Sequence, residues 1–308
     1  MNISTSLLFD RATENMGTLQ SKLATTQAQL AASKQILSPS DAPDQAAAIQ
    51  RLRGEIDKQA NHKANLQVAL RHYSTEETAL KSSSDILVRI KELAIQAAND
   101  TQGADSRKAI STEMKALRDQ LLSLGNTQDD SGNYIFSGTR VKTQAFATDA
   151  TGQVTYQGDQ TQTHIPAGIE RTVAFTRSGT DVFSRVVRTD AQGQTQSVGF
   201  FNALDQMIGA VDNSQTSGIQ QSISDVDQMQ SNLTLSLAQS GSDQNIVQSQ
   251  MDVLDETSLR LKSSLSDVED LDYASAVTNM NKQMMALQAA MGSFSKISSL
   301  TLFDYIQK

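Results

Sequence analysis

The 308-residue sequence contains no cysteine, three histidines and three prolines. The absence of cysteine excludes disulfides, thiolate metal sites and cysteine nucleophiles together. No run of residues approaches the roughly 18 consecutive apolar side chains that a membrane-spanning helix needs. The first residues, MNISTSLLFDR, lack the basic leader and the apolar core of a secretory signal. We therefore expect no membrane insertion, and no export by a route that cleaves a signal peptide.

The chain is also short of positive charge, with a formal net charge of −8 at pH 7. A protein that neutralises nucleic-acid phosphates needs a basic surface, so we expect no nucleic-acid partner.

The spacing of His62, His72 and His164 does not match a metal-binding pair on one helix face. Residues 129–133, DDSGN, lack the full ligand pattern of a calcium loop and predict a turn. No phosphate-binding glycine loop or nucleophile elbow is present. We expect no enzyme activity, no catalytic or metal-binding residue and no cofactor.

Two of the three prolines, Pro39 and Pro43, lie in one short segment and predict a hinge. Residues before proline avoid the helical conformation, so a first helix should end near Leu37 and a second should start after Pro43. Apolar residues recur at helical spacing from Asp44 to about Asn99, from residue 110 to 124 after a turn at 100–105, and again from residue 201 onwards. The chain thus predicts several long helices.

Helical spacing stops at Gly125. Residues 125–201 hold nine of the sixteen glycines and eight of the fourteen aromatic residues, and the short runs 154–156 and 172–175 alternate as strands do. We expect a mainly α fold with a small β insertion: a long antiparallel helical bundle with coiled-coil-like N- and C-terminal helices and an outer antiparallel β module. The expected domains are residues 1–43 with 271–308 for assembly, 44–133 with 201–270 as a helical core, and 134–200 as a β-rich outer domain.

The two ends of the chain carry matching apolar stripes. Apolar residues near the C-terminus alternate at spacings of three and four, and leucines near the N-terminus follow the same period, which places each set on one side of a helix. The predicted interface residues are Leu19, Leu23, Leu30, Leu37, Val277, Met280, Met284, Leu287, Met291 and Phe294.

The terminal segments are poor in charge. Residues 1–37 and 274–308 hold only nine charged side chains among 72 residues, and the remaining positions are mostly Ala, Ser, Thr, Asn and Gln. A helix pair inside one chain leaves its second side in water, where charged residues are usual. We therefore infer that the terminal helices form an interface with other copies of the chain. Pairing of the two ends in a monomeric helical bundle is the alternative.

Several short strings resemble a known family. Residues 32–43, ASKQILSPSDAP, resemble the N-terminal hinge of the bacterial flagellin superfamily, and more closely of its hook-associated protein 3 branch. Residues 272–274, 286–289 and 297–305 are similar to the C-terminal signature of the same family. Residues 133–139, NYIFSGT, resemble the junction between helical core and outer domain in this branch.

The resemblance implies a structural subunit between the flagellar hook and filament, exported by the flagellar type III pathway with an export chaperone and located outside the cell. Its partners would be copies of itself in a tubular lattice, hook-associated protein 1 on the hook side, and flagellin or another junction protein on the filament side. One alternative is flagellin, which would form long filaments. Another is a type III secreted translocator, which would need a membrane-active apolar segment.

Overall fold

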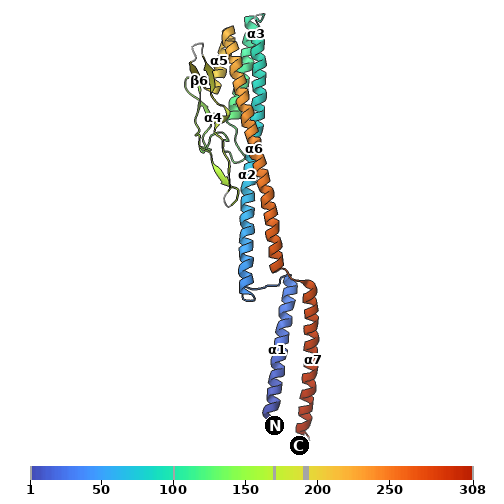
Figure 1. Cartoon of the computed structure of the whole chain (residues 1–308). Helices are drawn as coiled ribbons and strands as arrows, with labels where there is room; N and C mark the ends of the chain where they lie inside the picture. Colours follow the sequence, from blue (N-terminus) through green and yellow to red (C-terminus); the bar gives the residue numbers. More distant parts are fainter. Residues whose placement is uncertain (1, 100, 169–170, 190–193, 307–308) are drawn as a thin grey trace. The chain divides into compact units, whose positions relative to one another are not determined.

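The computed structural model describes residues 2–99, 101–168, 171–189 and 194–306, which form seven helices and six short strands. The chain divides into two compact units (Figure 1). Met1–Lys58 and Glu256–Lys308 make up the terminal unit, and Gln59–Asp255 make up the central unit. Both boundaries fall inside long helices. The division into three domains expected from the sequence remains a prediction.

The terminal unit contains α1 (Asn2–Ala32), the start of α2 (Pro43–Ala97), the end of α6 (Thr216–Glu269) and α7 (Tyr273–Ile306). Helices α1 and α7 lie side by side and run in opposite directions (Figure 1). Helix α7 starts after Asp272, whose carboxylate accepts hydrogen bonds from the backbone N–H of Ala274 and Ser275 at 3.0 and 3.3 Å. Asp272 is thus the N-cap that fixes the start of this helix.

Helix α1 ends five residues earlier than the proline pattern predicts. Its last residue is Ala32, because Ser33 adopts a left-handed conformation with φ of 58°. The backbone N–H of Lys34 then donates to the carbonyl oxygen of Gln29 at 3.2 Å, the bond that closes a Schellman motif. Leu37 therefore lies in the segment between α1 and α2 and not on the α1 stripe, so its assignment to that stripe was wrong.

The central unit is built on a helical core. Helices α3 (Ala104–Gly125) and α5 (Phe200–Asp212) pack together, and their apolar faces share one buried cluster with α2 and α6. Fully buried members include Leu87, Ile90, Met114, Leu121, Leu204, Met207 and Val211. A second, smaller cluster joins Leu66 and Tyr73 of α2 to Val173 and to Val247 of α6. The helical periodicity of the sequence thus marks the buried faces correctly.

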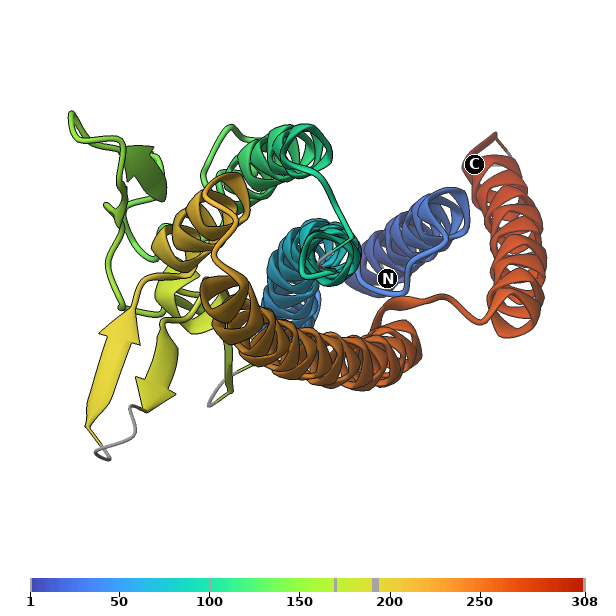
Figure 2. The same ribbon diagram turned by 90° about the horizontal axis from the view of Figure 1, so that it is seen from above.

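The β module consists of three separate antiparallel pairs: β1 (Phe146–Thr148) with β2 (Val154–Tyr156), β3 (His164–Pro166) with β4 (Thr172–Ala174), and β5 (Val186–Thr189) with β6 (Thr195–Val198). The pairs lie to one side of the helices of the central unit (Figure 2). A cluster of aromatic rings joins this module to α5. Phe183, which follows the short helix α4 (Gly179–Val182), contacts the rings of Phe136, Phe146 and Phe200, and the ring of Phe146 also contacts that of Phe201. The expected mainly α fold with a β insertion is confirmed.

Residues 133–139 form the entry to this module. Ile135 and Phe136 are buried, and the carbonyl oxygen of Phe136 accepts hydrogen bonds from Gly179 N–H at 2.7 Å and from the Tyr156 hydroxyl at 3.0 Å. Gly138 has φ of 65°, and a Cβ at this position would collide with the backbone oxygen of Asp159. Glycine is required here on both counts, since left-handed backbone is costly for other residues.

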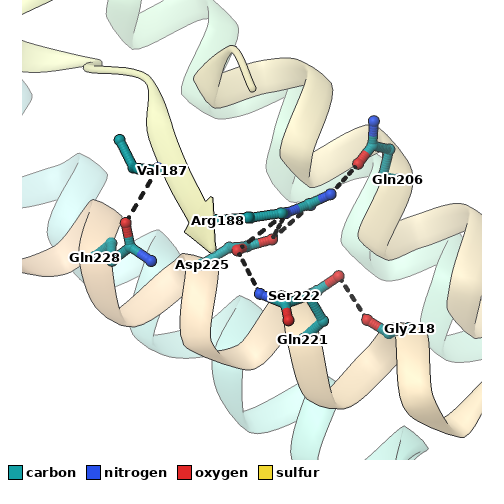
Figure 3. A network of polar contacts seen from close by, with 8 residues as sticks. All are labelled: Val187, Arg188, Gln206, Gly218, Gln221, Ser222, Asp225 and Gln228. Carbon is teal, nitrogen blue, oxygen red and sulfur yellow. Dashed lines mark hydrogen bonds and ion pairs between the residues drawn. The ribbon is translucent and has the colours of Figure 1, made fainter. Parts of the chain in front are cut away.

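One buried ion pair fastens the third strand pair to the helices. Arg188 of β5 donates from Nε and Nη2 to the carboxylate of Asp225 on α6, at 3.0 and 2.6 Å, and from Nη1 to Gln206 on α5 at 2.7 Å (Figure 3). The side chain of Asp225 is almost completely buried, and Gln221 also donates to it at 3.4 Å. Such charge-assisted, two-pronged bonds fix both distance and orientation. They determine where β5 sits on the core.

Candidate assembly surface

The inner face of the terminal helices is a coiled-coil-like seam. Half-buried or buried side chains recur at spacings of three and four on both α1 and α7, as in a heptad pattern. Near the open end of the pair, the rings of Phe9 and Phe294 meet edge to face with centroids 5.4 Å apart. The seam, as defined here, consists of Phe9, Ala12, Met16, Leu19, Leu23, Thr26 and Leu30 on α1 and Ala276, Met280, Gln283, Leu287, Ala290 and Phe294 on α7.

The structure splits the predicted C-terminal stripe into two faces. Met280, Leu287 and Phe294 lie in the seam, opposite the α1 face that carries Leu19, Leu23 and Leu30. The other three residues form what we call the outer stripe: Val277, Met284 and Met291, with 41, 38 and 50 % of their surface exposed. They follow one another at intervals of seven residues, so they line one side of α7. Helix α1 alone cannot cover both faces.

The surroundings of the outer stripe are almost free of charge. Between Tyr273 and Lys296, the only charged side chains on α7 are Lys282 and Lys296 themselves. Met285, with 61 % exposed surface, lies next to the stripe. Burying such a face removes apolar area from water without stripping water from charges, so contact with another helix is favourable. The outer stripe is thus an exposed apolar face that is suited to packing against another helix.

The hinge contains both predicted prolines. Pro43 is the first residue of α2, where its fixed φ and missing N–H suit a helix start. Before it, the Asp41 carboxylate accepts hydrogen bonds from the backbone N–H of Ser38 at 2.8 Å and of Leu37 at 3.2 Å. These bonds, with the one from the Ser38 backbone foremost, lower the pKa of Asp41. Leu37 and Pro39 line a hollow of about 150 Å³ beside the first turns of α2.

Glu269 ties the two chain connections of the hinge together, and sequence reasoning missed it. Its Oε1 lies 2.5 Å from Lys34 Nζ and 2.5 Å from Arg53 Nη2. Its carbonyl oxygen accepts the backbone N–H of Gln35 at 2.8 Å, and the N–H of Leu271 donates to Ser33 at 3.3 Å. The hydrogen bond from Lys34 contributes most to lowering the pKa of Glu269. Glu269 is the last residue of α6, where an acidic side chain is unfavourable next to the negative end of the helix dipole unless it has a cationic partner. This unfavourable position was the feature of the sequence that could have indicated an ion pair.

The histidines and the 129–133 segment, considered from the sequence as possible metal ligands, lie in the central unit. Within the described residues, no three His, Asp or Glu side chains come together as metal ligands, and no helix is long and apolar enough to cross a membrane. Asp129 accepts hydrogen bonds from the backbone N–H of Ser131 and Asn133 at 2.8 and 2.9 Å, and so organises the predicted turn. His62 is partly buried on α2, and His164 is exposed on β3.

His72 is the exception, since it is buried and its two ring nitrogens have no hydrogen-bond partner among the described residues. Its ring lies against that of Phe175, with centroids 4.6 Å apart. Burial lowers the pKa of His72 to about 4, against a weaker opposing influence of Asp129. The imidazole is therefore neutral in the folded central unit at neutral pH.

This burial predicts a loss of stability in acid. The unfolded chain binds a proton at His72 near pH 6.5 and the folded chain only near pH 4, so between these values the unfolded state holds more protons. The contribution of His72 to the free energy of unfolding should fall by about 3 kcal/mol across this range. In urea denaturation followed by circular dichroism, His72→Leu should show a flatter pH dependence than the unmodified chain. His164→Gln, at an exposed position, should not; equal slopes in all three proteins would contradict the assignment.

Comparison with known proteins agrees with this arrangement. Two sequence profiles match: the bacterial flagellin N-terminal helical region over residues 3–141 and the bacterial flagellin C-terminal helical region over residues 205–306. The flagellar hook-associated protein 3 of Escherichia coli K12 is 23 % identical over 99 % of both chains. A flagellin of Clostridium tyrobutyricum is 27 % identical, but over only 46 % of this chain and 37 % of its own length.

A solved structure shows the same fold. It is that of a putative flagellar hook-associated protein from Vibrio parahaemolyticus, with 21 % identity and a TM-score of 0.67 over 75 % of this chain and all of the other. The two profiles together match both helical regions that flank the β module, and the full-length match is to a hook-associated protein. The chain therefore belongs to the bacterial flagellin family, on its hook-associated protein 3 branch.

Proposed function

We propose that this chain is a structural subunit of the bacterial flagellum that joins the hook to the filament and assembles through its terminal helices. The observation that carries the proposal is the outer stripe of α7, an apolar and nearly uncharged face that α1 leaves exposed, on a chain that matches a flagellar hook-associated protein 3 from end to end. The role is architectural rather than catalytic.

The terminal pair is suited to folding coupled with assembly. Two helices that share one seam bury only one face each, so much of their apolar surface is covered only when further helices are added. Copies of the same chain supply such helices, and repeated head-to-tail contacts build an open, tubular lattice. The seam then holds α1 and α7 together, and the outer stripe contacts the next copy.

The partners follow from a position between two other assemblies. Hook-associated protein 1 would lie on the hook side, and flagellin or another junction protein on the filament side. The subunit would pass through the flagellar type III pathway, accompanied by an export chaperone, and would reside outside the cell. A flagellin role is disfavoured because the hook-associated protein 3 of Escherichia coli K12 aligns over 99 % of both chains, whereas a polar flagellin of Vibrio parahaemolyticus aligns over 70 % of this chain and 74 % of its own length.

Deletion of the gene in a flagellated strain tests the proposal. Cells should keep their hooks but lose their filaments, with flagellin released into the medium, and the intact gene should restore them. Gold-labelled antibodies against the chain should mark one short band between hook and filament. Labelling along the whole filament would assign the flagellin role instead, and filaments retained by the deletion strain would refute a junction role.

A further inference from the structure

The methionines of the described residues range from fully buried to exposed. Met114, Met207 and Met229 are fully buried in the core of the central unit. In contrast, Met284 and Met291 belong to the outer stripe and Met285 lies beside it, all three with exposed side chains. The chain has no cysteine, so thioethers are its only oxidisable sulfur groups. An oxidant in solution would meet the sulfur atoms of α7 first.

The chemistry at these positions is oxygen transfer from a peroxide. A sulfur lone pair attacks one oxygen of hydrogen peroxide, the S–O bond forms as the O–O bond breaks, and the departing hydroxide takes up the proton to become water. Sulfur loses two electrons and the peroxide gains them. The product, methionine sulfoxide, is polar and accepts hydrogen bonds, so it no longer suits an apolar contact.

We propose that Met284, Met285 and Met291 form an oxidation site that controls whether a free subunit can join the assembly. The inference rests on the proposed function, because it requires the outer stripe to be the contact with the next copy. A subunit oxidised before assembly would present sulfoxide oxygens where the neighbouring chain offers apolar groups. A subunit already in place would be protected, because the neighbouring copy covers the same sulfur atoms.

The position of the three residues makes the site separable from the fold. They lie outside the seam, so their oxidation leaves the contacts between α1 and α7 in place. Met16 and Met280 are half-buried within the seam and should react more slowly. The three core methionines should not react while the central unit is folded. The expected order of oxidation is therefore the three exposed methionines first, the two seam methionines next, and the core methionines last.

The test uses the purified full-length chain and isolated hooks that carry the preceding junction protein. The chain is treated with increasing hydrogen peroxide, peptide mass spectrometry measures sulfoxide at each methionine, and electron microscopy counts hooks that gain the subunit. We expect Met284, Met285 and Met291 to oxidise first, and addition to hooks to fall at least tenfold when they are oxidised. The core methionines should stay reduced, which shows that the fold is intact.

The triple variant Met284→Leu, Met285→Leu and Met291→Leu is the matched control, since leucine keeps the apolar character and nearly the volume. It should add to hooks before and after peroxide treatment. Should this variant fail to add even untreated, reduction of the oxidised original chain with methionine sulfoxide reductases of both stereospecificities replaces it, and must restore addition. Subunits already on hooks should resist oxidation at the three positions.

The outcomes separate the inference from the function on which it rests. Addition of the fully oxidised chain at the untreated rate would overturn the inference and leave the proposed function standing. Failure of reductase treatment to restore addition, or equal loss in the triple variant, would also overturn it, since the damage would lie elsewhere. Failure of the untreated original chain to add to hooks would overturn the proposed function and the inference together.

Discussion

Replacing Met284 and Met291 by serine should abolish the retention of filaments while leaving the melting temperature of the isolated chain nearly unchanged. Both side chains are exposed in the single chain and would be buried only by the next copy. Covering the remaining apolar surface of each contributes about 2 kcal/mol, so the pair weakens each contact between subunits roughly a thousandfold. Thermal unfolding of the purified variant and filament counts on cells expressing it measure the two effects.

The matched control is the pair Met280→Ser and Leu287→Ser, on the same helix and with the same spacing of seven residues. These side chains lie in the seam, so this variant should lose helix content and resistance to proteolysis in the terminal unit of the isolated chain. If the outer-stripe variant instead unfolds as this control does, then Met284 and Met291 belong to an intramolecular core. The proposed lattice contact would then be wrong.

The second large effect is expected at Arg188. Replacing it by alanine leaves the carboxylate of Asp225 buried without its cationic partner, and breaking a buried pair in this way typically costs about 3 to 5 kcal/mol. For a unit of this size the melting temperature should fall by roughly 10 °C. Thermal and urea unfolding followed by circular dichroism give both values.

Arg185→Ala is the control for this experiment. Arg185 lies just before the same strand pair and donates to Ser197 at 2.8 and 2.9 Å, but it is exposed and has no acidic partner in these bonds. Its loss should change the free energy of unfolding by less than about 1 kcal/mol. Adding Asp225→Ala to Arg188→Ala should recover part of the lost stability, and a fully additive double variant would show that the two side chains do not act as a pair.

Most of the helical architecture could be predicted from the sequence, because long helices repeat their apolar positions many times. Ile90, Met114, Leu121 and Leu204 all proved to be buried at the predicted faces. The end of α1 could not be predicted, because the chain turns at Ser33, and a single serine in the left-handed conformation leaves no periodic trace. The prolines indicated a hinge but not the residue at which the helix stops.

The candidate assembly surface was only partly predictable, for a different reason. The alternating spacings of three and four residues place Val277, Met280 and Met284 on one broad stripe of the helix. The spacing does not tell how much of that stripe a single neighbouring helix covers. Burial in the structure separates the half in the seam from the half left outside. Glu269 escaped notice because its partners, Lys34 and Arg53, are more than 200 positions away in the chain.

The double connection at the hinge has a mechanical consequence. A helix pair attached through a single backbone segment could rotate about the single bonds of that segment and would transmit no torque. Here, two backbone segments lead into the pair of α1 and α7, one after α1 and one before α7. Glu269 links the two segments through Lys34 and the backbone of Gln35. Twisting α1 and α7 about their common axis would have to break this bridge. A rotating flagellum needs a coupling of this kind, in which rotation of one part is passed on to the next without slippage.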